Sequence, residues 1–261
     1  MTKILTITLL IAAFSLGLCA QTKQYAEPHE LKIESLVRRT FPSYFGKRQR
    51  YPQLIPENFY PIGWSRDGKF AYYVEPVDEA CGCYFAMLVI QDMRTDKEVW
   101  KFKYSQDDSY VGDKMTGPGD IRSLWKKNQK LFSEKLAEND IVASRSVMLG
   151  KTFTSGGRRF TASSMKKRGP NADGYEDRVN LYTISLSAPK LGAKNVFTSE
   201  DHTKDDYWFM LDAGLIGVIS SPFEDRVAII AVEVMRGYEG PPHTGDIRIV
   251  GADLKSGFEK R

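Results

Sequence analysis

Short apolar runs rich in β-branched and aromatic residues recur along most of this chain, and turns of Gly, Asp, Ser and Pro separate them. Runs of this length and composition are typical of β-strands, and short connections between them favour antiparallel hairpins. The strands that we expect lie at 70–74, 84–90, 98–104, 142–148, 152–161, 181–186, 207–219, 227–234 and 246–254. The pattern predicts a mainly β fold, with antiparallel hairpins packed as a sandwich or a partial propeller-like sheet and one or two helices.

Three stretches depart from this strand pattern. Asp120 can cap a helix, and the apolar residues behind it follow helical spacing: Ile121, Leu124, Trp125, Phe132 and Leu136. A shorter helical pattern lies within residues 21–57, which are otherwise polar and basic, and residues 163–178 read as a polar, basic loop. We therefore expect a polar N-terminal segment, 21–57, followed by a single mainly β domain, 58–261.

The first 20 residues have the pattern of a secretory signal peptide. Lys3 precedes an uncharged run from Ile4 to Ala20, and cleavage after Ala20 leaves Gln21 as the first mature residue. This predicts export to the periplasm or beyond the cell, with no transmembrane segment after the signal is removed. The alternative is a lipid anchor at Cys19, although a bulky leucine precedes that cysteine where lipoprotein signals have a small residue.

The charge balance and the expected export limit the kinds of partner that this protein can bind. The chain has 37 Lys and Arg against 33 Asp and Glu, a formal charge of +4, which is too small an excess to indicate nucleic acid. With 42% hydrophobic and 12% aromatic residues the chain is also not a disordered one. We therefore expect an envelope protein, a glycan or a small ligand as the partner, and no nucleic acid.

Cys81 and Cys83 are the cysteines that remain after the signal is removed, and two cysteines do not make a disulfide framework. Gly82 lets the backbone bend between them, so a disulfide between Cys81 and Cys83 is the candidate that export favours. A thiol metal site without its other ligands and two ordinary buried thiols are the alternatives.

The catalytic motifs that the sequence offers are incomplete. Gly150-Lys151-Thr152 lacks the earlier glycine of a phosphate-binding loop, and Ser163-x-x-Lys166 lacks the partner motifs of penicillin-binding proteins. An acidic group around His202 matches no calcium loop and reads as a solvated loop. The sequence therefore predicts neither a metal site nor a cofactor.

A polar turn near the C-terminus is the candidate binding site. Its members are Arg236, Tyr238, Glu239 and His243. The Gly and Pro content of 237–243 predicts a tight hairpin loop between the strands at 227–234 and 246–254. Such a turn can form a small polar site, or it can be a rigid loop whose polar groups face solvent.

Two elements carry a resemblance to known proteins. Residues 62–71, Ile-Gly-Trp-Ser-Arg-Asp-Gly-Lys-Phe-Ala, resemble the opening of a family of predicted secreted bacterial proteins of unknown function. Residues 237–242, Gly-Tyr-Glu-Gly-Pro-Pro, resemble that family's closing element, and the Ser-x-Asp-Gly-Lys turn is also similar to turns of TolB-type propeller blades. The resemblance implies export and brings no catalytic residues.

Two hairpins of the chain resemble one another. Residues 65–71 and 221–228 share a serine, an acidic turn, a basic residue and an apolar strand containing Ala. Each strand leads to a second one that ends in Asp and a basic turn, which suggests a two-copy repeat of a β-hairpin.

These observations together predict an exported bacterial envelope protein that acts as a non-catalytic binding or structural module. The absence of a nucleophile-plus-base pattern favours that hypothesis. The alternative is an exported hydrolase whose site is assembled from scattered polar residues such as His243, Glu239 and Asp67.

Overall fold

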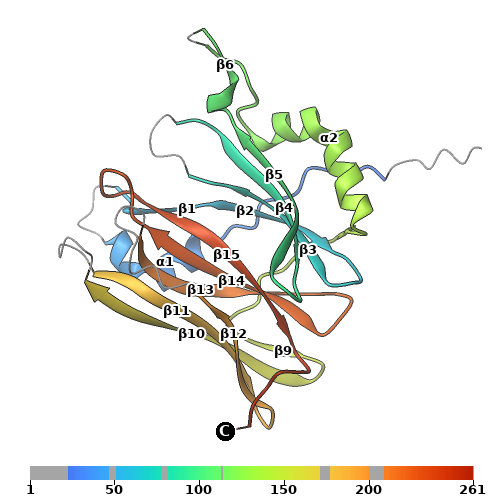
Figure 1. Ribbon diagram of the computed structural model, residues 1–261, viewed down its shortest axis with the longest axis vertical. Helices are drawn as coiled ribbons and strands as arrows, with labels where there is room; N and C mark the ends of the chain where they lie inside the picture. The colour runs from blue at the N-terminus through green and yellow to red at the C-terminus, as the bar shows by residue number, and fades with distance from the viewer. Residues whose placement is uncertain are drawn as a thin grey trace, which may run out of the picture.

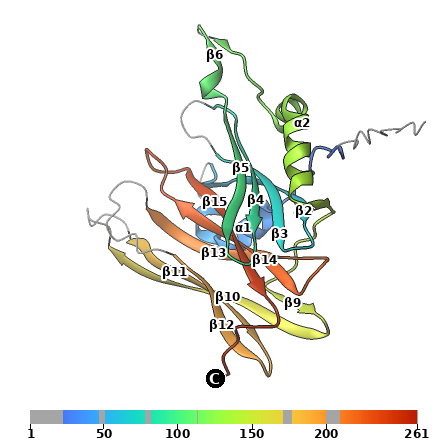
Figure 2. The same ribbon diagram turned by 45° about the vertical axis from the view of Figure 1, so that its right-hand side comes forward.

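The computed structural model describes residues 23–46, 51–77, 82–112, 114–170, 177–199 and 209–260. Within these ranges the chain forms four stacked layers, one helix and three sheets, in the order α2, the β2–β5 sheet, the β13–β15 sheet and the β9–β12 sheet (Figures 1 and 2). This confirms the expected mainly β fold of packed antiparallel hairpins.

The middle sheet has the strand order β1-β15-β14-β13, in which only β1 runs parallel to its neighbour. Its strands are β1 (Leu54–Pro56), β13 (Met210–Ser220), β14 (Arg226–Met235) and β15 (His243–Asp253). Along β14 the side chains alternate between two cores, with Ile229 facing the β9–β12 sheet and Ile230 facing the β2–β5 sheet. Because both faces are covered, the sequence of β14 reads as an apolar run rather than an alternating one.

The second sheet has the order β5-β4-β3-β2-β8. Its strands are β2 (Asn58–Trp64), β3 (Lys69–Glu75), β4 (Phe85–Asp92), β5 (Lys97–Ser105) and β8 (Val142–Ala143). One face, with Tyr72, packs on the middle sheet, and the other, with Tyr73, packs on α2 (Ile121–Glu138). The helix begins as predicted, because the Asp120 side chain accepts a hydrogen bond from the Ser123 N–H at 2.7 Å.

The third sheet, with the order β12-β11-β10-β9, is an outer layer. Its strands are β9 (Thr152–Ser155), β10 (Arg158–Pro170), β11 (Asp177–Ala188) and β12 (Gly192–Thr198). The expected loop at 163–178 is therefore wrong for residues 163–170, which continue β10, and for residues 177–178, which begin β11 and pair with β10; residues 171–176 are not among the described residues. The polar composition of that stretch reflects exposure, since nearly all of its side chains face water while Phe160 and Ala162 fill the core.

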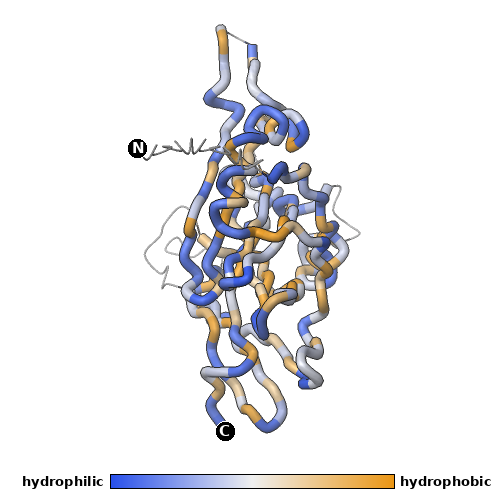
Figure 3. Tube along the Cα trace, turned by 90° about the vertical axis from the view of Figure 1, so that its right-hand side faces the viewer, coloured by the Kyte–Doolittle hydropathy of each residue, from blue (hydrophilic) through white to orange (hydrophobic). Residues whose placement is uncertain are grey.

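The described residues of the polar segment 21–57 pack into the same body as the strands that follow. Helix α1 (Glu34–Thr40) buries Val37, and Phe41 and Leu54 join the core between the first two sheets. The remaining elements are the short helices η1 (Pro42–Phe45) and η2 (Asp107–Ser109) and a two-stranded sheet of β6 (Tyr110–Val111) and β7 (Lys114–Met115). That last sheet projects from the body of the molecule (Figure 3).

The strand expected at 142–148 is short, because β8 pairs with β2 only at Gly63 and Trp64. No helix in the described part of the chain is long and apolar enough to cross a membrane. The expected signal peptide, 1–20, and the alternative anchor Cys19 lie outside the described residues.

The two similar hairpins are β3–β4 and β14–β15, and a similar hydrogen bond closes the turn that precedes each of them, from β2 to β3 and from β13 to β14. Ser65 N–H donates to the Lys69 carbonyl at 2.9 Å, and Ser221 N–H donates to the Arg226 carbonyl at 2.9 Å. The two hairpin ends also contact each other, since Arg226 Nη1 donates to the Met93 carbonyl at 3.0 Å. The repeat seen in the sequence thus corresponds to alike hairpins in adjacent sheets.

Candidate functional site: an acidic cleft beside strand β15

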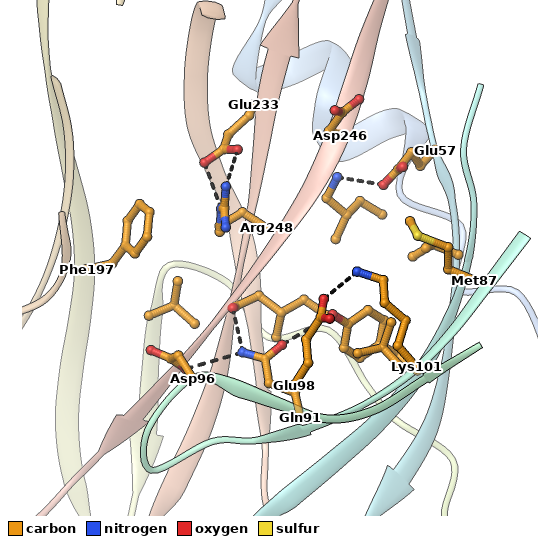
Figure 4. A pocket seen from close by; sticks show the side chains of 16 residues that line it. Glu57, Met87, Gln91, Asp96, Glu98, Lys101, Phe197, Glu233, Asp246 and Arg248 are labelled. Atoms are coloured by element: carbon orange, nitrogen blue, oxygen red, sulfur yellow. Dashed lines mark hydrogen bonds and ion pairs between the residues drawn. The ribbon is translucent and has the colours of Figure 1, made fainter. Parts of the chain in front are cut away.

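A cleft of about 380 Å³ lies between the β3–β5 part of the second sheet and strand β15 (Figure 4). Its carboxylates are Glu57, Asp96, Glu98, Glu233 and Asp246, and its cations are Lys101 and Arg248. Tyr72, Val74, Met87 and Val89 supply an apolar wall. A concave site of this size with an apolar wall and a few polar groups is typical of ligand pockets.

Strand β15 carries the polar side of the cleft because its residues alternate. Asp246 and Arg248 lie on one face, and Ile247 and Ile249 lie on the other face and pack toward the β2–β5 sheet. Strand β1 pairs with β15 only as far as Gly245. Beyond that residue β15 is the outer strand of its sheet, so its edge faces the cleft.

Glu233 and Arg248 form a two-point ion pair across β14 and β15. Arg248 Nε lies 2.9 Å and Nη2 2.8 Å from the two carboxylate oxygens of Glu233. These hydrogen bonds and the charge of Glu233 raise the pKa of Arg248. The guanidinium also lies 5.2 Å from the ring centre of Phe197, so ion pair and ring together fix its position.

Glu57 is buried and contacts β15 twice. Its backbone N–H donates to the Gly245 carbonyl at 3.0 Å, and its Oε2 accepts from the Ile247 N–H at 2.7 Å. Burial, and next the charge of Asp246, raise the pKa of Glu57 to about 8, against the lowering effect of the Ile247 N–H. At neutral pH the Glu57 carboxyl is therefore mostly protonated.

Gln91 and Asp96 bind the other end of the β15 edge. Gln91 Nε2 donates to the Ile249 carbonyl at 3.1 Å, and Asp96 Oδ1 accepts from the Gly251 N–H at 2.7 Å. Tyr72 supports Gln91 through a hydroxyl hydrogen bond of 3.2 Å to Gln91 Oε1. These side chains therefore satisfy backbone groups of an edge strand.

The candidate residues from the polar turn lie elsewhere, since none of them lines the cleft. The hairpin itself is confirmed: β14 ends at Met235, β15 begins at His243, and the two strands pair. His243 is buried, and its Nδ1 accepts from the Gly237 N–H at 3.2 Å. Tyr238 and Glu239 are exposed. Binding by this turn stays a prediction.

Other sequence candidates fall partly outside the described residues. Cys83 is buried and disulfide-bonded, whereas Cys81 and the acidic group around His202 are not among the described residues. The pairing of Cys81 with Cys83 therefore stays a prediction. In the ranges that the structure describes, no group of three His, Cys, Asp or Glu side chains is placed to hold a metal ion.

None of the charged residues of the cleft was among the site residues predicted from the sequence. Glu233 had a usable signal, because it is the one charged residue in the otherwise apolar run 227–234. Asp246 and Arg248 alternate with isoleucines, as on any exposed strand, and Glu57 stands in a polar segment. Those three residues carry no signal that separates a cleft from a surface.

Comparison with known proteins returned no relative. No protein-family model, no curated protein and no solved structure matches the chain. The resemblance to a family of secreted bacterial proteins therefore remains an expectation from the sequence.

Proposed function

We propose that this protein is an exported bacterial envelope protein that acts as a non-catalytic binding module, and that the acidic cleft holds a cationic ligand. The composition of the cleft carries this proposal. Five carboxylates and two cations line the cleft, so the carboxylates remain in the majority when the Glu57 carboxyl is protonated. A concave, partly apolar site with one dominant sign of charge attracts ligands of the opposite sign.

The hydrogen bonds of the cleft support the proposed binding, because they hold its carboxylates in place. Glu233 is held by Arg248 at two points, and Asp96 and Glu57 each accept a backbone N–H of β15. These hydrogen bonds fix the carboxylates before a ligand arrives. A pre-organised site of this kind lowers the entropy lost when a ligand is bound.

Calorimetric titration at low salt tests the proposal with two blocked pentapeptides, Lys-Val-Lys-Val-Lys and Glu-Val-Glu-Val-Glu. We expect binding of the lysine peptide alone. Asp246→Asn should weaken it about fivefold, the effect of losing about 1 kcal/mol of charge interaction. Glu138→Gln, at an exposed carboxylate of α2 that does not line the cleft, is the matched control and should leave the affinity unchanged. Equal binding of both peptides, or weakening by the control alone, contradicts the proposal.

The exported hydrolase is the second candidate, and one observation favours it. A protonated Glu57 in the same cleft as Asp246 provides the acid and the carboxylate that glycoside hydrolysis uses. A panel of p-nitrophenyl glycosides separates the two candidates. Release of p-nitrophenol that disappears in Glu57→Gln would support the hydrolase, and no release above buffer is expected for the binding module.

A further inference from the structure

The outward edge of β15 is bonded almost continuously along its length. His243 N–H donates to the Gln53 carbonyl at 2.8 Å, and Glu57 binds both Gly245 and Ile247. Farther along, Gln91 binds the Ile249 carbonyl and Asp96 binds the Gly251 N–H. The partners come from β1 and its continuation at one end and from β4 and the following turn at the other.

Two neighbouring backbone groups between the contacts of Glu57 and Gln91 are left over. The N–H and the C=O of one strand residue point to the same side, so the Ile247 carbonyl and the Ile249 N–H also point outward. Neither group has a hydrogen-bond partner among the residues that the structure describes. Both isoleucines line the cleft, and both groups lie on the edge of β15 that faces it.

The spacing of the two groups matches a parallel β-ladder. In such a ladder one residue of the partner strand donates its N–H to residue i−1 and accepts from the N–H of residue i+1. Ile247 and Ile249 are those positions for a partner opposite Arg248. Strand β1 already pairs in parallel with β15 up to Gly245, and the Glu57 carboxyl takes the next N–H. A ligand residue opposite Arg248 therefore lies where β1 would continue if it were longer.

We propose that the cleft binds an extended peptide segment with basic side chains, which pairs in parallel with β15 through the Ile247 carbonyl and the Ile249 N–H. This inference rests on the proposed binding function and names its ligand class. Addition of a strand to an exposed sheet edge is a common mode of peptide recognition, in which backbone bonds supply affinity and side-chain contacts supply specificity.

The side chains of the cleft fit such a peptide. Side chains of paired residues lie on the same face of a sheet, so the ligand residue opposite Arg248 places its side chain beside Asp246 and Glu233. The next side chains of the ligand point the other way, toward Met87 and Glu98. A basic side chain on either face of the bound strand meets a carboxylate, and its aliphatic stem covers the apolar wall.

Backbone N-methylation of the ligand tests the pairing without changing its charge. The parent probe is the blocked pentapeptide Lys-Val-Lys-Val-Lys, compared with one isomer methylated at the amides of its second and third lysines and one isomer methylated at the amides of its two valines. A strand presents alternate amides to each edge, so only one isomer loses the hydrogen bond to β15. We expect that isomer to bind at least tenfold more weakly and the other to stay within about threefold of the parent.

Amide hydrogen exchange supplies the second measurement. The Ile249 N–H should exchange at least tenfold more slowly when the parent peptide is bound, because it gains an acceptor. Equal affinity of all three peptides, together with unchanged exchange at Ile249, overturns strand pairing. If in that case spermidine binds as tightly as the peptides, and Asp246→Asn weakens the binding of both, the proposed binding of a cationic ligand holds without strand pairing. If no cationic probe binds, the proposed function fails as well.

Discussion

Replacing Glu57 with glutamine isolates the electrostatic property that distinguishes this cleft. Glutamine keeps an oxygen that accepts the Ile247 N–H, and its size is nearly that of the protonated carboxyl. It removes the ionisation that burial and Asp246 oppose. Glu57→Gln therefore leaves the packing in place and changes how the stability of the fold depends on pH.

The direction and the size of this pH dependence follow from the raised pKa of Glu57. The folded protein holds the Glu57 proton up to a pKa of about 8, whereas the unfolded chain releases it near 4.5. Between these values the folded state binds more protons, so the wild-type protein loses stability as pH rises and levels off above pH 8. From pH 5 to pH 9 the loss that glutamine avoids is about 4 kcal/mol, most of it below pH 8.

Urea unfolding at pH 5, 6, 7, 8 and 9 measures the effect. We expect the difference in unfolding free energy between Glu57→Gln and the wild-type protein to change by about 4 kcal/mol over this range, in favour of the variant at high pH. Glu138→Gln, at an exposed carboxylate of α2 paired with Lys135, is the control and should give a difference that stays within about 1 kcal/mol. If the difference in unfolding free energy between Glu57→Gln and the wild-type protein does not change with pH, the assignment of a protonated, buried carboxyl is refuted.

Three further predictions concern the fold and the compartment. Asp120→Ala removes the cap of α2 and should lower the unfolding free energy by about 1 kcal/mol in urea titrations, and no loss contradicts the role of the cap. Gly251→Ala places a Cβ 1.9 Å from a carbonyl oxygen of the β4–β5 turn and should destabilise by more than about 2 kcal/mol. Gly150→Ala is its control, because the nearest neighbour of the added Cβ lies at 3.7 Å, and it should be nearly neutral in the same urea titrations. N-terminal sequencing of protein from a bacterial envelope fraction should begin at Gln21; an uncleaved chain contradicts export with cleavage, and acylated Cys19 identifies the lipid anchor instead.

Local sequence was sufficient where local interactions decide the structure. The cap Asp120 and the apolar spacing behind it placed α2 correctly, and the Gly-Pro turn at 237–242 joins the strands that it was expected to join. The apolar runs at 84–90 and 227–234 became β4 and β14 because β-branched and aromatic residues fit a buried, pleated surface. The same rule failed at 163–170, where a strand on an outer layer carries the polar residues of a loop.

Only the tertiary structure decided which polar residues face each other. Glu57 and Ile247 are 190 positions apart, and they meet because β1 packs against the start of β15. Glu233 and Arg248 meet because the register of a single hairpin brings them to the same face. A charged residue on a strand looks the same in sequence whether water or a cleft lies beside it. The cleft therefore depends on the order in which the sheets stack and on where β1 ends, and both are set by long-range packing of apolar faces that local patterns do not record.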